Sequence, residues 1–330
     1  MVKLLLILLL CLPTTEVHAR TKYAIHNDFK AACRITAPMG RGTLGIGNLF
    51  LGAMSKGMQS GNKLKIEQHC TTSSYDHKKI KMWVITPKVT RVNPMPAILF
   101  LHGGGFVFKG APYHYDLAKE YAQRTGSVVV MVDYRTAHNN PYGVPLCDCQ
   151  DAWMWMTTNA DVLGIDTSKT AIVGDSAGGF LAIKTTLWAV GKSAVKPAKM
   201  MLIYPVVDCS MRTLSMKTFV DTPVWNSQLN SKMWGYYLKD NTEQSLLDLA
   251  IRTLQTLPPT YIESAEYDCL RDEAEIFAEK LRQAGVYTLY ITTHGTMHGF
   301  DMVPKSHITQ TQINLRSKWL QWEVRDDLAL

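Results

Sequence analysis

The sequence predicts an α/β fold in which a mostly parallel, twisted sheet carries helices on both faces. From about residue 78 onward, short apolar runs rich in β-branched residues alternate with longer helical patterns. Continuous apolar runs are typical of strands covered on both faces, and their alternation with helices indicates right-handed crossovers between parallel strands. The length of 330 residues is enough for one large domain with a sizeable core.

Seven apolar runs are predicted as the strands of this sheet. They cover residues 79–87, 97–102, 127–134, 170–175, 201–207, 260–268 and 286–292. Helices are expected between them. One begins near Pro112 and stops at Gly126, and another has acidic residues in its first turn and ends at Gly285, where glycine accepts a left-handed conformation. The segment 307–324 is expected to be a terminal helix that packs Ile308, Leu315, Trp319 and Trp322.

Two segments interrupt the alternation and are predicted to form a helical cap. Residues 20–77 precede the sheet pattern, and a second insertion at about 208–250 contains a helical, aromatic-rich stretch. The catalytic domain is therefore expected to span residues 78–330. The run Gly40–Gly45 matches the spacing of a dinucleotide-binding loop, but it follows Pro38 without a preceding strand, so we interpret it as an ordinary loop.

The N-terminus is typical of a secretory signal peptide covering residues 1–19. Lys3 is followed by an apolar run over 4–12 and by small residues before Ala19. This run is about half of the roughly 20 residues that cross a bilayer, so no stable membrane span is expected. The predicted protein is exported, with an uncleaved signal anchor as the alternative.

Charge and cysteine content restrict the function only loosely. The formal net charge is +7, but charged residues are 19% of the chain and scattered, which argues against a nucleic-acid-binding surface. Signal removal would leave six cysteines, at 33, 70, 147, 149, 209 and 269. Either disulfides or free buried thiols are compatible with that count, and a homo-oligomer is compatible with the sequence.

The segment "AIVGDSAGGF" has the pattern of a nucleophile elbow. A predicted strand leads into Gly174-x-Ser176-x-Gly178, and a helical pattern follows at once. Small neighbours allow the sharp turn that exposes a serine hydroxyl where strand meets helix. A second loop, "HGGGF" at 102–106, follows another strand, and its amides together with that of Ala177 could stabilise an oxyanion.

A base and an acid for this serine follow later strands. His298 lies just beyond the last predicted strand, and Asp268 ends the one before it, which gives the chain order Ser, Asp, His. Glu266 is the nearest competitor for the acid. His294 and His298 could also be a metal pair, but Gly295 and the preceding strand argue against a shared helix, so no metal is expected.

These residues resemble the hormone-sensitive-lipase-like family of α/β-hydrolases, which includes bacterial acetyl esterases and arylacetamide deacetylase. The resemblance rests on "HGGGF" at 102–106, "YRTAHNNP" at 134–141, "GDSAGG" at 174–179, and "EYDCLRDE" with a final "HGF". It implies an α/β-hydrolase fold with a two-part cap. It makes Ser176 the nucleophile, His298 the base, Asp268 its orienting acid, and Gly103, Gly104 and Ala177 the oxyanion donors.

The chain departs from the family pattern at two motifs. Cys269 replaces a proline after the acid, and His138 with Asn139 replaces a Pro-Glu pair. The first departure puts the stiffness of the turn after Asp268 in question. The second removes whatever the glutamate would anchor.

The resulting hypothesis is a cofactor-free serine carboxylesterase acting on short- to medium-chain esters, with water as cosubstrate. Arylamide deacetylation and lipase activity are alternatives within the same chemistry, and a non-catalytic ligand- or partner-binding protein is the alternative of another class. Aromatic side chains are expected to line the substrate pocket. The candidates are Phe106, Phe108, Trp225 and Trp234.

Overall fold

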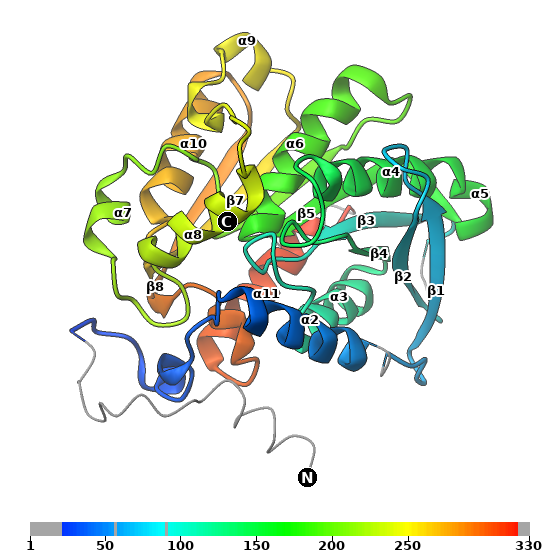
Figure 1. Ribbon diagram of the computed structural model, residues 1–330. Helices are drawn as coiled ribbons and strands as arrows, with labels where there is room; N and C mark the ends of the chain where they lie inside the picture. Colours follow the sequence, from blue (N-terminus) through cyan, green and yellow to red (C-terminus); the bar gives the residue numbers. More distant parts are fainter. Residues whose placement is uncertain (1–21, 56–57, 90–91, 323–330) are drawn as a thin grey trace.

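A single eight-stranded sheet organises the computed structural model, which describes residues 22–55, 58–89 and 92–322. The strand order is β1-β2-β4-β3-β5-β6-β7-β8. The first two pairings, β1 with β2 and β2 with β4, are antiparallel, and every later pairing is parallel. The prediction of a mostly parallel sheet is therefore confirmed (Figure 1).

A strand lies at each of the seven predicted runs, and one more precedes them. The strands are β1 (Leu64–Thr72), β2 (Lys79–Pro87), β3 (Met95–Leu101), β4 (Val128–Asp133), β5 (Ile165–Asp175), β6 (Lys199–Ile203), β7 (Thr260–Tyr267) and β8 (Thr288–Met297). The predicted bounds are wrong at three ends, because β5 begins at Ile165, β6 ends at Ile203 and β8 extends to Met297.

The helices include the four that were predicted outside the cap. They are α2 (Arg41–Ser55), α3 (Pro112–Thr125), α4 (Val144–Thr158), α5 (Ala160–Leu163), α6 (Ala177–Lys192), α7 (Leu214–Thr218), α8 (Ser227–Leu238), α9 (Ile251–Leu254), α10 (Arg271–Gln283) and α11 (His307–Leu320). Short 3-10 turns are η1 (Asn27–Phe29), η2 (Ala32–Arg34), η3 (Leu246–Asp248) and η4 (Phe300–Met302). Gly126 after α3 and Gly285 after α10 adopt left-handed conformations, as the sequence predicts.

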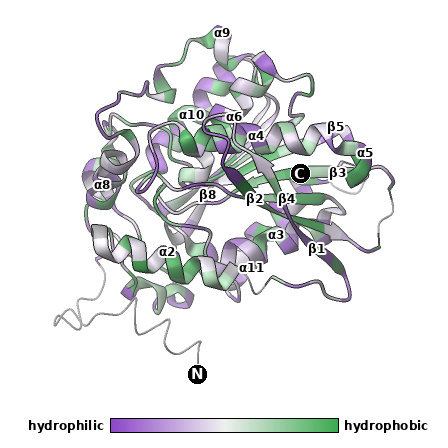
Figure 2. Cartoon of the chain, turned by 45° about the vertical axis from the view of Figure 1, so that its right-hand side comes forward, coloured by the Kyte–Doolittle hydropathy of each residue, from purple (hydrophilic) through white to green (hydrophobic). Residues whose placement is uncertain are grey.

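Helices cover both faces of the sheet and bury two apolar layers. Successive residues of one strand point to opposite faces, so Leu99 of β3 packs in the layer with α4, α6 and α10, whereas Ile98 packs in the layer with α3 and α11. Figure 2 shows the green, apolar strands running between these helices. Burial on both faces explains why the central strands are continuous apolar runs.

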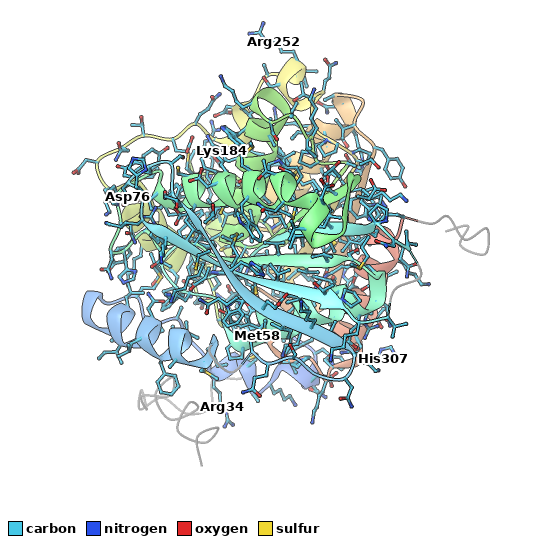
Figure 3. All side chains as sticks on the ribbon, turned by 90° about the vertical axis from the view of Figure 1, so that its right-hand side faces the viewer. Arg34, Met58, Asp76, Lys184, Arg252 and His307 are labelled. Atoms are coloured by element: carbon cyan, nitrogen blue, oxygen red, sulfur yellow. The ribbon has the colours of Figure 1, made fainter. Side chains whose placement is uncertain are left out.

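The predicted start of the sheet pattern at residue 78 is wrong, because β1 lies inside the segment expected to be cap. Among the described strands, this edge strand pairs with β2 alone, and most of its positions alternate between exposed and half-buried. It therefore lacks the continuous apolar run by which the inner strands were found. The turn between β1 and β2 is held by Asp76, which accepts hydrogen bonds from Arg135 at 2.8 Å (Figure 3).

The interpretation of Gly40–Gly45 as a loop is also wrong, because α2 begins at Arg41. Glycine inside a helix costs up to about 1 kcal/mol relative to alanine, so local propensity argues against this helix. The tertiary contacts of α2 outweigh this cost. Leu44 is fully buried, and Asn48 donates to the Val107 carbonyl at 2.7 Å and accepts from the Lys109 amide at 2.8 Å. Helix α2 is thereby attached to the segment that follows the glycine loop.

The two predicted cap segments contact each other. The Val224 amide donates to the Ile35 carbonyl at 3.0 Å, and the Tyr236 hydroxyl donates to the Met39 carbonyl at 3.1 Å. Residues from before the sheet are thus joined to the insertion that follows β6. Their role as a cap stays a prediction.

The predicted signal peptide, residues 1–19, lies outside the described residues. Within the described ranges, none of the helices combines the length and apolar character needed to span a bilayer. The six cysteines at 33, 70, 147, 149, 209 and 269 are free thiols, of which Cys149 and Cys269 are buried and Cys70 is exposed.

Candidate active site

Ser176 occupies a sharp turn between β5 and α6. Its backbone has φ 54° and ψ −123°, a conformation that side-chain-bearing residues rarely adopt and that costs on the order of 1–3 kcal/mol. Three hydrogen bonds hold it there. The Ser176 amide donates to the Ile203 carbonyl at 2.9 Å, and its carbonyl accepts from the Gly179 and Val206 amides at 2.9 and 3.0 Å. The predicted elbow geometry is present.

Glycines beside Ser176 are required by close backbone approach. A Cβ at Gly174 would overlap the Gly178 carbonyl oxygen, and a Cβ at Gly178 would overlap the Leu101 carbonyl oxygen. A Cβ at Gly179 would lie 2.6 Å from the Pro205 Cβ. The motif therefore lets the first turn of α6 pack directly on the ends of β3 and β6.

Gly178→Ala is expected to destabilise the fold by about 3 kcal/mol, because the methyl group meets a backbone oxygen that cannot move aside. The matched control is Gly191→Ala in the last turn of α6, where nothing outside the neighbouring residues and backbone of the helix lies within 4 Å of the added carbon. That control should be neutral or slightly stabilising. Urea unfolding of both variants measures the difference, and equal stabilities would contradict this explanation of the motif.

Ser176, His298 and Asp268 form one hydrogen-bonded line. The Ser176 Oγ lies 2.8 Å from His298 Nε2, and His298 Nδ1 lies 2.6 Å from Asp268 Oδ2. The other Asp268 oxygen accepts from the Leu270 amide at 3.0 Å. The three residues follow the ends of β5, β8 and β7, so parallel strands deliver them to one edge of the sheet.

The competing residues lie elsewhere. His294 is 82% exposed, and its Nδ1 lies 3.4 Å from Glu266 Oε2. Glu266 also accepts from the Gly295 amide at 2.7 Å, so it supports the end of β8 and not the imidazole of His298. In the part of the chain that the structure describes, no three His, Cys, Asp or Glu side chains converge on a metal site.

The glycine loop lies against the serine, with one change to the predicted donors. A Cβ at Gly103 would lie 3.0 Å from the Ser176 Cβ. However, the Gly103 amide donates to Asp175 Oδ1 at 3.0 Å, so its proton is already used and its prediction as an oxyanion donor is wrong. Gly104 and Gly105 have positive φ values of 115° and 58°, and their amides have no recorded partner among the described residues.

A buried pair behind the elbow, Asp175 and His114, holds this loop and was missed in the sequence. His114 Nδ1 accepts from the Ala111 amide at 2.9 Å, so the proton on Nε2 faces Asp175 Oδ2 at 3.0 Å. Burial alone would raise the pKa of Asp175, but His114 and the Gly103 amide outweigh it and lower the pKa. A carboxylate at the end of a buried strand was the available signal, because such a group needs partners.

The four predicted pocket aromatics lie in three different places. Trp225 lies at the site, since its ring is 6.0 Å from that of His298 and its edge would be 2.7 Å from a Cβ at Gly105. Phe106 is fully buried, 5.7 Å from Trp234 and stacked on Tyr237 at 4.1 Å, in an aromatic cluster of the core. Phe108 is half-buried and faces Gly47 of α2.

Glu273 is a further buried acid near the site. The sequence suggests a first-turn helix charge, and Glu273 is in the first turn of α10, but its side chain is fully buried. Its Oε1 accepts from the Val207 and Asp208 amides at 2.7 and 3.2 Å. Burial raises the pKa of Glu273 well above its usual value, and the charges of Asp208 and Asp268 act in the same direction against the two amides.

Glu273→Gln is expected to gain stability relative to the natural chain as pH rises. A carboxyl group whose pKa is higher in the folded state contributes most below its unfolded pKa, about 4.5, and loses that contribution as pH rises towards its folded pKa. Glutamine can still accept from both amides and does not ionise. Melting temperatures between pH 4.5 and 9 measure this, with the exposed Glu279→Gln on the same helix as control. A difference that stays constant with pH would contradict the raised pKa.

Comparisons with known proteins agree with this fold and site. Residues 98–302 match the family described as the alpha/beta hydrolase fold, and the chain belongs to this family, within its hormone-sensitive-lipase-like esterase group. It is 31% identical over 246 residues to carboxylesterase NlhH of Mycobacterium tuberculosis, covering 72% of this chain and 76% of that protein. It is 32% identical over 208 residues to ethyl acetate hydrolase of Pseudomonas putida, covering 62% and 65%.

Among solved structures, a bacterial heroin esterase superposes with a TM-score of 0.79 at 30% identity. The match covers 90% of this chain and 97% of that one. The α/β-hydrolase fold predicted from the motifs is confirmed by this match and by the family model.

Proposed function

We propose that the protein is a serine carboxylesterase that hydrolyses short- to medium-chain carboxylic esters through an acyl-enzyme. The observation that carries the proposal is the hydrogen-bonded line of Ser176, His298 and Asp268 beside two glycine amides without recorded partners. The names of the carboxylesterase and ethyl acetate hydrolase relatives support the same reaction class.

The first half of the reaction transfers the acyl group to the serine. His298 Nε2 takes the hydroxyl proton as Ser176 Oγ attacks the ester carbonyl, which forms the Oγ–C bond and places negative charge on the carbonyl oxygen. Collapse of this tetrahedral intermediate breaks the bond to the alkoxy oxygen. The protonated imidazole gives its proton to that oxygen, so the alcohol leaves neutral.

The second half repeats these steps with water. His298 takes a proton from a water molecule, whose oxygen attacks the acyl carbon, and then returns the proton to Ser176 Oγ as the carboxylic acid leaves. Asp268 stays ionised and accepts a hydrogen bond from the Nδ1–H of the imidazole throughout, which fixes the tautomer that presents Nε2 to the serine.

Gly104, Gly105 and Ala177 are the proposed oxyanion donors. Ala177 is the first residue of α6, so its amide has no partner within the helix. Donors of this kind act on charge that develops only in the transition state, and each is worth about 3–4 kcal/mol in studied cases. Gly103 contributes through Asp175, which fixes the start of the loop.

Trp225 supports a preference for acyl or alcohol groups of limited size. Trp225 is 5% exposed, and the Asn230 side-chain oxygen accepts from its indole N–H at 3.2 Å, so its ring is held against the glycine loop. Ser176 and His298 are each only 5% exposed, which indicates narrow access.

Export through removal of residues 1–19 is part of the proposal. It rests on the charged start, the apolar run and the small residues before Ala19. Mass measurement of the protein released by an exporting host tests it. A mass that begins at Arg20 supports export, and retention of the full chain in the membrane favours the signal anchor.

Hydrolysis of p-nitrophenyl acetate, butyrate, octanoate and palmitate, with p-nitroacetanilide as an amide, tests the proposed activity. We expect the highest kcat/KM on the shorter esters and no turnover by Ser176→Ala. A preference for palmitate favours a lipase, and a preference for the anilide favours a deacetylase. Absence of serine-dependent turnover on every substrate overturns the proposal and favours a non-catalytic binding protein.

A further inference from the structure

Hydrogen bonds to Ser176 and Asp268 are not the only contacts of the His298 imidazole. The ring of Tyr204 meets it edge-on, with ring centroids 4.8 Å apart and an interplanar angle of 60°. Tyr204 directly follows β6 and is 1% exposed. Its backbone φ of 34° is unusual for a residue with a side chain, so other contacts must hold it in place.

Tyr204 is tied to the loop that carries His298. Its hydroxyl donates to Asp301 Oδ2 at 2.7 Å, and Asp301 is three residues beyond His298 in η4. Burial raises the pKa of Tyr204 well above its usual value, so the hydroxyl stays protonated and continues to donate. This bond joins the end of β6 to the loop 298–302.

A buried ion network fixes Asp301 in turn. Arg316 of α11 donates from Nη1 to Asp301 Oδ1 at 2.8 Å, and from Nε and Nη2 to the two oxygens of Glu263 at 2.8 Å each. Asp301 is 1% exposed, and Glu263 and Arg316 are fully buried. The hydroxyls of Tyr261 and Thr293 also donate to Glu263 at 2.8 and 3.0 Å.

We propose that Tyr204 and Asp301 are positioning residues that set the tilt of the His298 ring for proton transfer. The hydrogen bonds at Nδ1 and Nε2 fix the direction of the axis through these two ring atoms. Contacts against the faces and edges of the ring are needed to fix the rotation of its plane about that axis. The chain Glu263, Arg316, Asp301, Tyr204 therefore connects α11 and β7 to the base, and this inference rests on the proposed esterase function.

Positioning of the His298 ring can be distinguished from ordinary structural support because the network contains a second buried tyrosine that serves as a matched control. Tyr204 and Tyr261 are both buried tyrosines whose hydroxyls donate to a carboxylate bound to Arg316. The ring of Tyr204 also contacts that of His298, whereas the ring of Tyr261 contacts that of Trp319, with centroids 5.9 Å apart. Removing either hydroxyl takes away one of the hydrogen bonds that a buried carboxylate oxygen accepts.

Kinetics of Tyr204→Phe and Tyr261→Phe on p-nitrophenyl butyrate test the proposal. We expect Tyr204→Phe to lower kcat by about tenfold or more with KM nearly unchanged, since displacement of a catalytic group on the order of 1 Å can cost about 100-fold. Tyr261→Phe should keep the natural kcat. Both should lose several degrees of melting temperature, because each leaves a buried acceptor short of a donor.

Asp301→Asn provides a second, independent variant. It keeps the shape of the side chain but weakens the bond that fixes Tyr204, and we expect the same fall in kcat with little change in KM. Equal kcat values for Tyr204→Phe and Tyr261→Phe, or a loss confined to KM, overturn the positioning role. The proposed function fails separately, namely if Ser176→Ala still hydrolyses the ester.

Discussion

Replacing His298 by alanine is expected to lower kcat on the order of 10⁴- to 10⁶-fold, because no other base lies within reach of Ser176 Oγ among the described contacts. The hydroxyl loses its proton acceptor and the leaving alkoxide loses its proton donor. Steady-state hydrolysis of p-nitrophenyl butyrate measures the loss. Adding Ser176→Ala to this variant should lower kcat little further, since the two residues act as a unit.

The matched control is His294→Ala, which removes the histidine that lies within β8, four residues before His298. His294 is 82% exposed and pairs with Glu266, so its removal should leave kcat close to that of the natural chain. A large loss in His294→Ala, or nearly full activity in His298→Ala, would contradict the assignment of the base.

Asp268→Asn is expected to lower kcat by about 10³- to 10⁴-fold with little loss of stability. The amide has almost the shape of the carboxylate, but its NH₂ group can donate to Nδ1 and so favour the tautomer with its proton on Nε2. In that tautomer His298 cannot accept the serine proton. The pH dependence of kcat and the melting temperature, measured together, separate this effect from unfolding.

Glu266→Gln serves as the control for Asp268→Asn. Glu266 lies near Asp268 in the sequence and was the competing candidate, but it accepts from Gly295 and faces His294. We expect its amide variant to keep kcat. If Glu266→Gln lost activity and Asp268→Asn did not, the acid would have been assigned to the wrong residue.

The central sheet was predictable from the sequence because strands buried on both faces need continuous apolar runs. The same criterion failed for β1, an edge strand whose outer positions are polar. It also failed for α2, whose glycines oppose helix formation while Leu44 and Asn48 supply tertiary contacts that no local pattern reveals. In both elements, tertiary packing stabilises a secondary structure that the local composition does not favour.

The line of Ser176, Asp268 and His298 was predictable because each residue ends or follows a recognisable strand. The contacts that hold this line in place were not predictable. Gly103 was predicted as an oxyanion donor, but its amide binds Asp175, and that contact joins residues 72 positions apart. The pairing of Arg316 with Glu263, 53 positions away, and with Asp301, 15 positions away, is likewise invisible to a local pattern.

The two departures from the family pattern have local substitutes. The turn after Asp268 lacks a proline at Cys269, but the Cys269 carbonyl accepts from the Ser215 hydroxyl at 2.8 Å and the Leu270 amide donates to Asp268. His138 lies 3.0 Å from the Thr136 hydroxyl and 3.4 Å from the Asn48 amide, which connects the second motif to α2. Hydrogen bonds therefore hold both segments where the family has other residues.

Labelling with a fluorophosphonate most directly tests the claim that Ser176 is the nucleophile of an acyl-enzyme. The reagent forms a stable bond only with a serine whose proton a neighbouring base removes. We predict a single adduct per chain, located on Ser176 by peptide mass measurement, loss of esterase activity in proportion to labelling, and no adduct on Ser176→Ala. An adduct on another residue, or esterase activity that survives complete labelling of Ser176, would contradict the account.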